Sequence, residues 1–142
     1  MERQIIINYC SNKIDEKINH IIQCLNLMEC FNGTIACNFS LYNNNQEILE
    51  KLKTLKGCEV IQIERKRQAV SKEEYFHLCI VVSFEIIEKF LQIIEKHELN
   101  IVMFWNKIKI FLNDNDGDFI IIDSKDSNYN KLKKFIKDSR AN

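Results

Sequence analysis

Apolar residues recur along this chain with two periods, and each period predicts a different kind of element. Between residues 35 and 42, Ile, Cys, Phe and Leu occupy every second position, which is the pattern of a strand with one buried face. Short apolar runs bounded by polar residues predict six further strands, at residues 4–10, 59–66, 75–82, 101–105, 108–112 and 119–123. The densest apolar stretch, residues 75–112, therefore contains three predicted strands.

Four other stretches place apolar residues three and four positions apart, which is the period of an amphipathic helix. Their apolar repeats span residues 14–28, 48–55, 86–94 and 132–136. The third helix is expected to turn its polar side toward water, with Glu85, Glu88, Lys89, Gln92, Glu95 and Lys96 exposed.

The predicted elements follow one another in the order β-α-β-α-β-β-α-β-β-β-α. This order predicts an α+β fold with one mixed sheet of about five to seven strands and four helices. Residues 34–105 alone read β-α-β-β-α-β, which is the split βαβ order of ferredoxin-like folds. No linker or repeat interrupts the chain, so we expect residues 1–142 to form a single globular domain. A fold of this class does not determine a function.

Composition narrows the class of protein. Of the residues, 46% are apolar and 28% are charged, and twenty basic side chains balance twenty acidic ones. No apolar run approaches the roughly 20 residues of a membrane span, and the N-terminal run is too short for a signal peptide, so we expect a cytoplasmic protein. Its six cysteines are then expected to be reduced thiols: Cys10, Cys24, Cys30, Cys37, Cys58 and Cys79.

Glycine and proline usage excludes the common nucleotide sites. The chain has no proline and only three glycines, Gly33, Gly57 and Gly117, each at a predicted boundary. A phosphate-binding loop needs clustered glycines for close backbone approach, so we expect neither a P-loop nor a Rossmann site and no cofactor. Abundant Ile, Asn and Lys suggest an AT-rich, bacterial genome.

The loop at residues 114–118 resembles part of a calcium site. Asp114 and Asp116 fall on two ligand positions when Gly117 is aligned with the sixth position of an EF-hand loop. The first position is then Leu112, which offers no side-chain oxygen, and the flanks read as strands. The interpretation we prefer is a hairpin turn that uses Gly117.

Two groups of reactive side chains share one face of an element. Glu16, His20 and Cys24 lie at four-residue spacing on the first helix, and they are the residue types of a nucleophilic relay. No oxyanion donors accompany them, so a solvated helix flank is the simpler interpretation. His77 and Cys79 lie about 6.6–7 Å apart along a strand, and a zinc site there needs two further ligands. We expect no catalytic and no metal site.

Charged and aromatic residues supply candidate contacts for a partner. Arg65, Lys66 and Arg67 form a basic stretch in a predicted hairpin loop, and the last helix is also basic. The acidic candidates are Asp114, Asp116, Asp118, Glu85, Glu88 and Glu95. Trp105, Tyr42 and Arg67 are candidate interface anchors, and core packing is the alternative for Trp105.

These observations favour a non-enzymatic protein-binding module. The class that matches its size and character is the small bacterial immunity or antitoxin protein, a toxin inhibitor that binds and neutralises a cognate toxin. We expect a protein partner and no membrane contact. The alternatives are an RNA-binding ferredoxin-like module, and a small ligand-binding protein or enzyme whose site is assembled from residues distant in sequence. Because the strand at 101–105 is apolar on both faces, either helices cover both sides of the sheet or one face awaits a partner.

Overall fold

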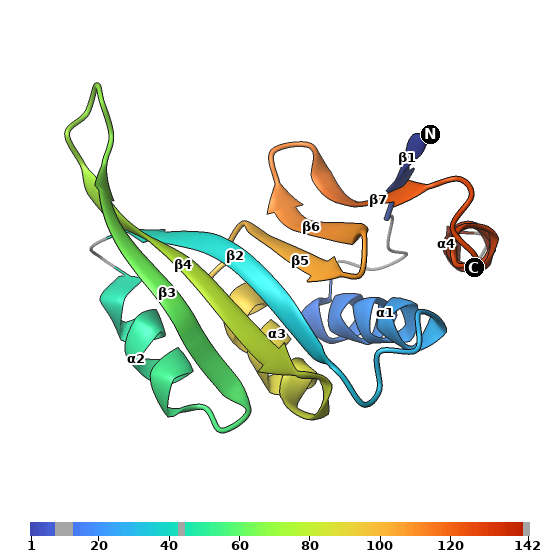
Figure 1. Ribbon diagram of the computed structural model, residues 1–142, viewed down its shortest axis with the longest axis horizontal. Coiled ribbons are helices and arrows are strands. Elements are labelled where there is room, and N and C mark those ends of the chain that lie inside the picture. The colour runs from blue at the N-terminus through green and yellow to red at the C-terminus, as the bar shows by residue number, and fades with distance from the viewer. Residues whose placement is uncertain (8–12, 43–44, 141–142) are drawn as a thin grey trace.

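The computed structural model describes residues 1–7, 13–42 and 45–140 (Figure 1). The described residues form the strands β1 (Glu2–Ile6), β2 (Thr34–Tyr42), β3 (Cys58–Arg67), β4 (Glu74–Ser83), β5 (Ile101–Trp105), β6 (Ile108–Asp114) and β7 (Gly117–Asp123). The helices are α1 (Ile14–Leu27), α2 (Gln46–Thr54), α3 (Ile87–Lys96) and α4 (Tyr129–Arg140), with a short 3-10 helix, η2 (Phe84–Ile86), before α3. The predicted order of elements is confirmed. The first predicted strand ran to residue 10, and its residues 8–10 lie outside the described part of the chain.

The strands join in one sheet in the order β1-β7-β6-β5-β2-β4-β3. The predicted α+β class and strand number are confirmed, although we expected a mixed sheet and all six pairings are antiparallel. Within β5-β2-β4-β3, strand β4 lies between β2 and β3, which is the split βαβ arrangement expected for residues 34–105. Strands β6, β7 and β1 continue the sheet beyond β5 (Figure 1).

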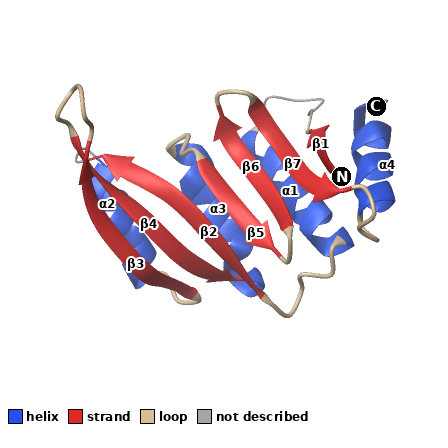
Figure 2. Ribbon diagram, turned by 45° about the horizontal axis from the view of Figure 1, so that its top comes forward, coloured by secondary structure: helices blue, strands red, loops and turns tan. Residues whose placement is uncertain are grey.

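The helices lie on one side of the sheet. Helices α1, α2 and α3 run behind the strands in Figure 2, and α4 packs beside α1 at the β1 end, where His20 and Phe135 place their rings 4.9 Å apart. No described helix crosses the opposite side, which we call the open face (Figures 1 and 2). Of the two arrangements expected for an apolar β5, the structure has the one with an uncovered face.

The core forms where the helix-facing side of the sheet meets the helices. Ile35, Cys37, Phe39 and Leu41 are all buried on β2, as the period of two predicts. The antiparallel register places Phe39 opposite Leu78 and Cys37 opposite Ile80, so β4 adds its own buried row to the same side. Phe90 and Leu91 of α3 are fully buried against these rows.

A close contact joins the loop before β2 to the end of β5. The Trp105 Nε1 donates a hydrogen bond to the Met28 carbonyl oxygen at 3.1 Å, and its ring lies against Gly33. A Cβ atom built at Gly33 would lie 2.6 Å from the Trp105 ring, closer than real contacts allow. Glycine is therefore required at position 33 by the indole beside it.

Replacing Gly33 with alanine should destabilise the fold through this contact. We expect Gly33→Ala to lower the free energy of unfolding by about 1–3 kcal/mol, the usual cost of overpacking, in urea denaturation followed by circular dichroism. The cost should be smaller in a Trp105→Phe background, because phenylalanine lacks the two ring atoms nearest Gly33. An equal cost in both backgrounds would show that the indole is not responsible.

Candidate functional site

The open face has an apolar half, made by β5, β6, β7 and β1. Phe111 lies directly opposite Phe119 in the register, and their rings stack with centroids 4.6 Å apart. Ile6 is paired with Phe119 from the other side, and 49% of its surface is exposed. Further members of the apolar half are Val102, Phe104 and Ile121, each partly buried, and Lys109 stands among them. Four adjacent strands thus present apolar side chains that no described helix covers.

The other half of the open face is polar and lies on β2, β4 and β3. The register places Ser40 opposite His77, and His77 opposite Glu64, so these three side chains form one row across the strands. The next row contains Tyr42, Tyr75 and Lys66, and the two tyrosine rings lie 5.6 Å apart. On the other side of the first row, Asn38 lies opposite Cys79. His77 and Cys79 share this face, as the strand period predicts.

The row of Ser40, His77 and Glu64 contains the residue types of a hydrolytic triad. Ser40 Oγ lies 3.5 Å from His77 Nδ1, at the long limit of a hydrogen bond. A triad also needs N–H donors aimed at a developing oxyanion, but backbone N–H groups lie in the plane of a sheet and cannot point above its face. The row therefore suits recognition by side-chain hydrogen bonds better than acyl transfer.

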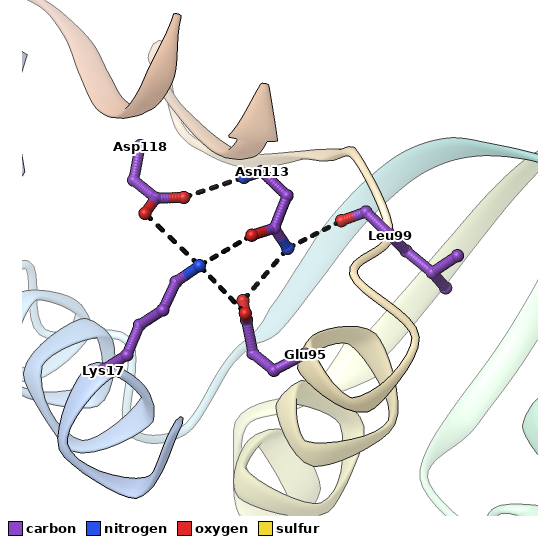
Figure 3. Close-up of polar contacts among 5 residues, drawn as sticks. All are labelled: Lys17, Glu95, Leu99, Asn113 and Asp118. Carbon is purple, nitrogen blue, oxygen red and sulfur yellow. Dashed lines mark hydrogen bonds and ion pairs between the residues drawn. The ribbon is translucent and has the colours of Figure 1, made fainter. Parts of the chain in front are cut away.

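A buried charge cluster lies on the helix side of the sheet (Figure 3). The Lys17 ammonium of α1 lies 2.9 Å from Glu95 of α3 and 3.3 Å from Asp118 of β7. Lys17 also donates to Asn113 Oδ1 at 2.7 Å, and Asn113 Nδ2 donates to the Leu99 carbonyl oxygen at 2.9 Å and to Glu95 at 3.2 Å. The cluster ties two helices to the β6–β7 turn.

This cluster corrects the expected acidic surface. Glu95 was predicted to face water and is only 5% exposed, because Lys17 and Asn113 draw its carboxylate inward. Asp118 is also turned inward, where it accepts a hydrogen bond from the Asn113 N–H at 2.8 Å. Neither carboxylate is presented to a partner.

The remaining acidic candidates lie in two separate places. Asp114 and Asp116 occupy the β6–β7 hairpin turn, where Asp114 accepts a hydrogen bond from the Asp116 N–H at 3.1 Å. Gly117 has φ 94° there, which agrees with the hairpin-turn interpretation. Glu85 and Glu88 are exposed near the first turn of α3. This helix is about 15 Å long, and it is its other end, with Glu95, that lies beside the β6–β7 hairpin (Figure 3). The six acidic residues therefore do not form one continuous surface.

The basic candidates all lie on a strand, as the strand predicted for residues 59–66 indicates for Arg65 and Lys66, and the assignment of the basic stretch to a hairpin loop is wrong. Arg65, Lys66 and Arg67 end β3, and successive side chains point to opposite faces of the sheet. Arg67 pairs with Glu74 at 2.6 Å, and Lys66 lies 3.5 Å from Glu64. Arg65 lies over the Phe76 ring. Each charge has a partner or a ring beside it, and only Lys66 lies on the open face.

Trp105 is held within the structure. It is half-buried, packs against the core and donates a hydrogen bond to Met28, which favours the core-packing alternative over an interface anchor. Sequence reasoning missed the apolar half of the open face, except that β5 was noted as apolar on both sides. The position of the apolar half depends on which strands flank β5 in the sheet.

The row of Glu16, His20 and Cys24 on α1 runs from an exposed residue to a buried one. Burial raises the pKa of the Cys24 thiol to about 12, and Glu16, two turns away along α1, is exposed. The five described cysteines are free thiols, and Cys10 lies outside the described residues. No group of three or more His, Cys, Asp or Glu side chains is placed to hold a metal ion within the described ranges.

Neither a protein-family model, nor a curated protein, nor a solved structure matches the chain. In the part of the chain that the structure describes, no helix is long and apolar enough to cross a membrane. Fold and site together define the class: an α+β protein whose antiparallel sheet is covered by helices on one face and carries a two-part open face on the other.

Removing the cation of the buried cluster should be costly. We expect Lys17→Met to lower the free energy of unfolding by about 3–5 kcal/mol, because Glu95 and Asp118 would remain buried without a countercharge. The loss should be smaller in a Glu95→Gln background. Arg67→Met breaks an exposed pair and should cost no more than about 1 kcal/mol. Equal losses for Lys17→Met and Arg67→Met in urea denaturation would contradict this account.

The thiols should differ sharply in reactivity. Cys24 and Cys30 have pKa values raised to about 12 by burial, and burial also raises the pKa of Cys37. Because the thiolate is the species that iodoacetamide alkylates, we expect these three to react at least tenfold more slowly at pH 8 than Cys79 on the open face. Peptide mapping by mass spectrometry measures each rate. In concentrated urea the rates should become similar, and equal rates in the native protein would refute the burial pattern.

Proposed function

We propose that this chain is a non-enzymatic protein-binding module that contacts its partner through the open face. The observation that carries the proposal is the apolar half, where side chains such as Phe104, Phe111 and Ile6 lie on adjacent strands with no described helix over them. An apolar patch bordered by polar residues is the usual make-up of a protein interface. Here the polar border is the half that contains Ser40 and His77.

The proposed partner is a toxin that this protein neutralises, in the manner of a small bacterial immunity protein. Blocking a toxin's active site needs a rigid, complementary surface and no chemistry of its own. A sheet face supplies such a surface, because both flanking strands hydrogen-bond each inner strand in place. The balanced overall charge supports recognition by shape and local contacts rather than by a strong general field.

A second candidate function is RNA binding, favoured by the polar half alone. Tyr42, Tyr75 and His77 lie on neighbouring strands of the split βαβ unit, and Lys66 stands beside the tyrosines. Aromatic side chains on such a sheet can stack on unpaired bases. Glu64 lies in the same region and opposes a phosphate backbone, which is why we rank this candidate second.

Substitution on the apolar half of the open face should weaken partner binding. After the partner is captured from the native cell and identified, we expect Val102→Lys and Phe104→Lys each to weaken the measured Kd at least tenfold, about 1.4 kcal/mol, because each places an ammonium group in an apolar contact. Gln92→Lys, on the exposed side of α3, is the matched control and should leave Kd unchanged. Circular dichroism checks that each variant is folded.

The same experiment separates the two candidate functions. Partner binding that extends over the polar half should slow the alkylation of Cys79, which lies there on β4 opposite Asn38. If the first candidate function is correct, a single-stranded RNA should bind weakly and should not protect Cys79 from alkylation. Tight RNA binding that falls steeply with salt and is lost in Tyr75→Ala would instead favour the second candidate. An unchanged Kd for both lysine variants would reject the open face as the protein-binding surface.

A further inference from the structure

The sheet has two edge strands, β3 and β1, and they differ in how they are protected. β3 has a register irregularity between Val60 and Gln62 and carries several charged side chains between Glu59 and Arg67. Bulges and charges are devices that natural edge strands use to prevent pairing with another chain. β1 pairs with β7 over five successive positions, from Glu2 to Ile6, without an irregularity. Its edge therefore lacks the irregularity found on β3.

Two hydrogen bonds at the ends of β1 show which of its backbone groups face outward. The Ile7 N–H donates to the Asp118 carbonyl oxygen at 2.9 Å, and the Met1 carbonyl oxygen accepts from the Ser124 N–H at 2.9 Å. Antiparallel strands alternate between residues that bond to the neighbour and residues that point away. Residues 1, 3, 5 and 7 thus face β7, so the backbone N–H and C=O groups of Glu2 and Gln4 point away from β7.

A groove runs along this edge, between β1 and α4. It has a volume of about 430 Å³ and is lined from β1 by Gln4, Ile5 and Ile6 and from α4 by Tyr129, Lys133, Ile136 and Lys137. α4 runs beside β1 at the N-terminal side of the sheet in both overall views (Figures 1 and 2). The groove thus combines an apolar floor, outward-pointing backbone groups and two ammonium groups.

The charge of the groove selects its occupant. Lys133 and Lys137 are exposed and lie one helical turn apart, about 6 Å along α4. Alternate side chains of an extended strand are about 6.6–6.8 Å apart, so two carboxylates on one face of a strand have nearly the spacing of these lysines. The exposed Asp138 also lies on α4 but does not line the groove.

We propose that an extended, acidic segment of a partner protein adds to β1 as an eighth strand in this groove. Backbone hydrogen bonds to Glu2 and Gln4 hold the segment, its apolar side chains contact the exposed Ile6, and its carboxylates on the opposite face meet Lys133 and Lys137. This is binding by strand addition, in which the backbone supplies affinity and alternate side chains supply specificity. The site adjoins the open face and shares Ile6 with it, but the outward backbone groups of β1 and the lysines of α4 lie outside that face, so this inference does not rest on the proposed function.

The test uses the full chain and a fluorescein-labelled peptide, Val-Glu-Val-Glu-Val-Glu-Val, in fluorescence polarisation. We expect saturable binding that Lys133→Glu and Lys137→Glu each weaken at least tenfold. Lys131→Glu and Lys134→Glu change exposed α4 lysines outside the groove and should alter Kd less than twofold. The peptide with lysine in place of glutamate should not bind. Equal weakening by all four variants, or no binding of the acidic peptide, would overturn the proposal and leave α4 as a shield for the edge.

A backbone variant tests strand addition separately from charge. Gln4→Pro removes an outward N–H while leaving the hydrogen bonds to β7 intact, and edge strands tolerate proline at such positions. We expect Gln4→Pro to weaken peptide binding at least tenfold. Gln4→Thr keeps the N–H and should bind the peptide with the affinity of the unaltered chain. Equal affinity of the proline and threonine variants would contradict strand addition. Val102→Lys on the open face should leave peptide binding unchanged, so failure of this site and failure of the proposed function are distinguishable.

Discussion

The helix-facing side of the antiparallel sheet supplies the strand half of the core, and its register holds the rest of the structure in place. The side-chain period of a strand is two, so a slip of one residue in β2 would move Ile35, Cys37 and Phe39 from the core to the open face. Everything on the open face is a consequence of that register. The row of Ser40, His77 and Glu64, and the stacked pair of Phe111 and Phe119, exist only because the buried rows are aligned.

The buried charge cluster imposes a second constraint at one end of the sheet. Lys17 is 14% exposed and lies between two carboxylates, so desolvation of three charges is offset by ion pairs and by hydrogen bonds through Asn113. This geometry holds the β6–β7 turn against α1 and α3. It also turns the carboxylates of Glu95 and Asp118 away from the exposed surface.

Much of the architecture was predictable, and much of the candidate site was not. The alternation in β2, the helical repeats and the split βαβ order were all predicted from local spacing. The solvent position of Glu95 was predicted wrongly, because helical periodicity places a residue relative to its own helix and does not show that Lys17 approaches from another helix. The strand predicted at 59–66 in fact continues to Arg67, and the basic stretch was assigned to a hairpin loop because a strand that leaves its side chains in water lacks the apolar signal of a buried one.

The sequence by itself determined the elements, their order and the side of each strand that is buried, since these depend on spacing between neighbours along the chain. Only the tertiary structure decided that the helices gather on one side, that β1 becomes an edge next to α4, and that the two halves of the open face adjoin. Those features bring together residues as distant as Ile6, Phe119 and Lys133, and contacts at such separation depend on strand order and packing rather than on local pattern.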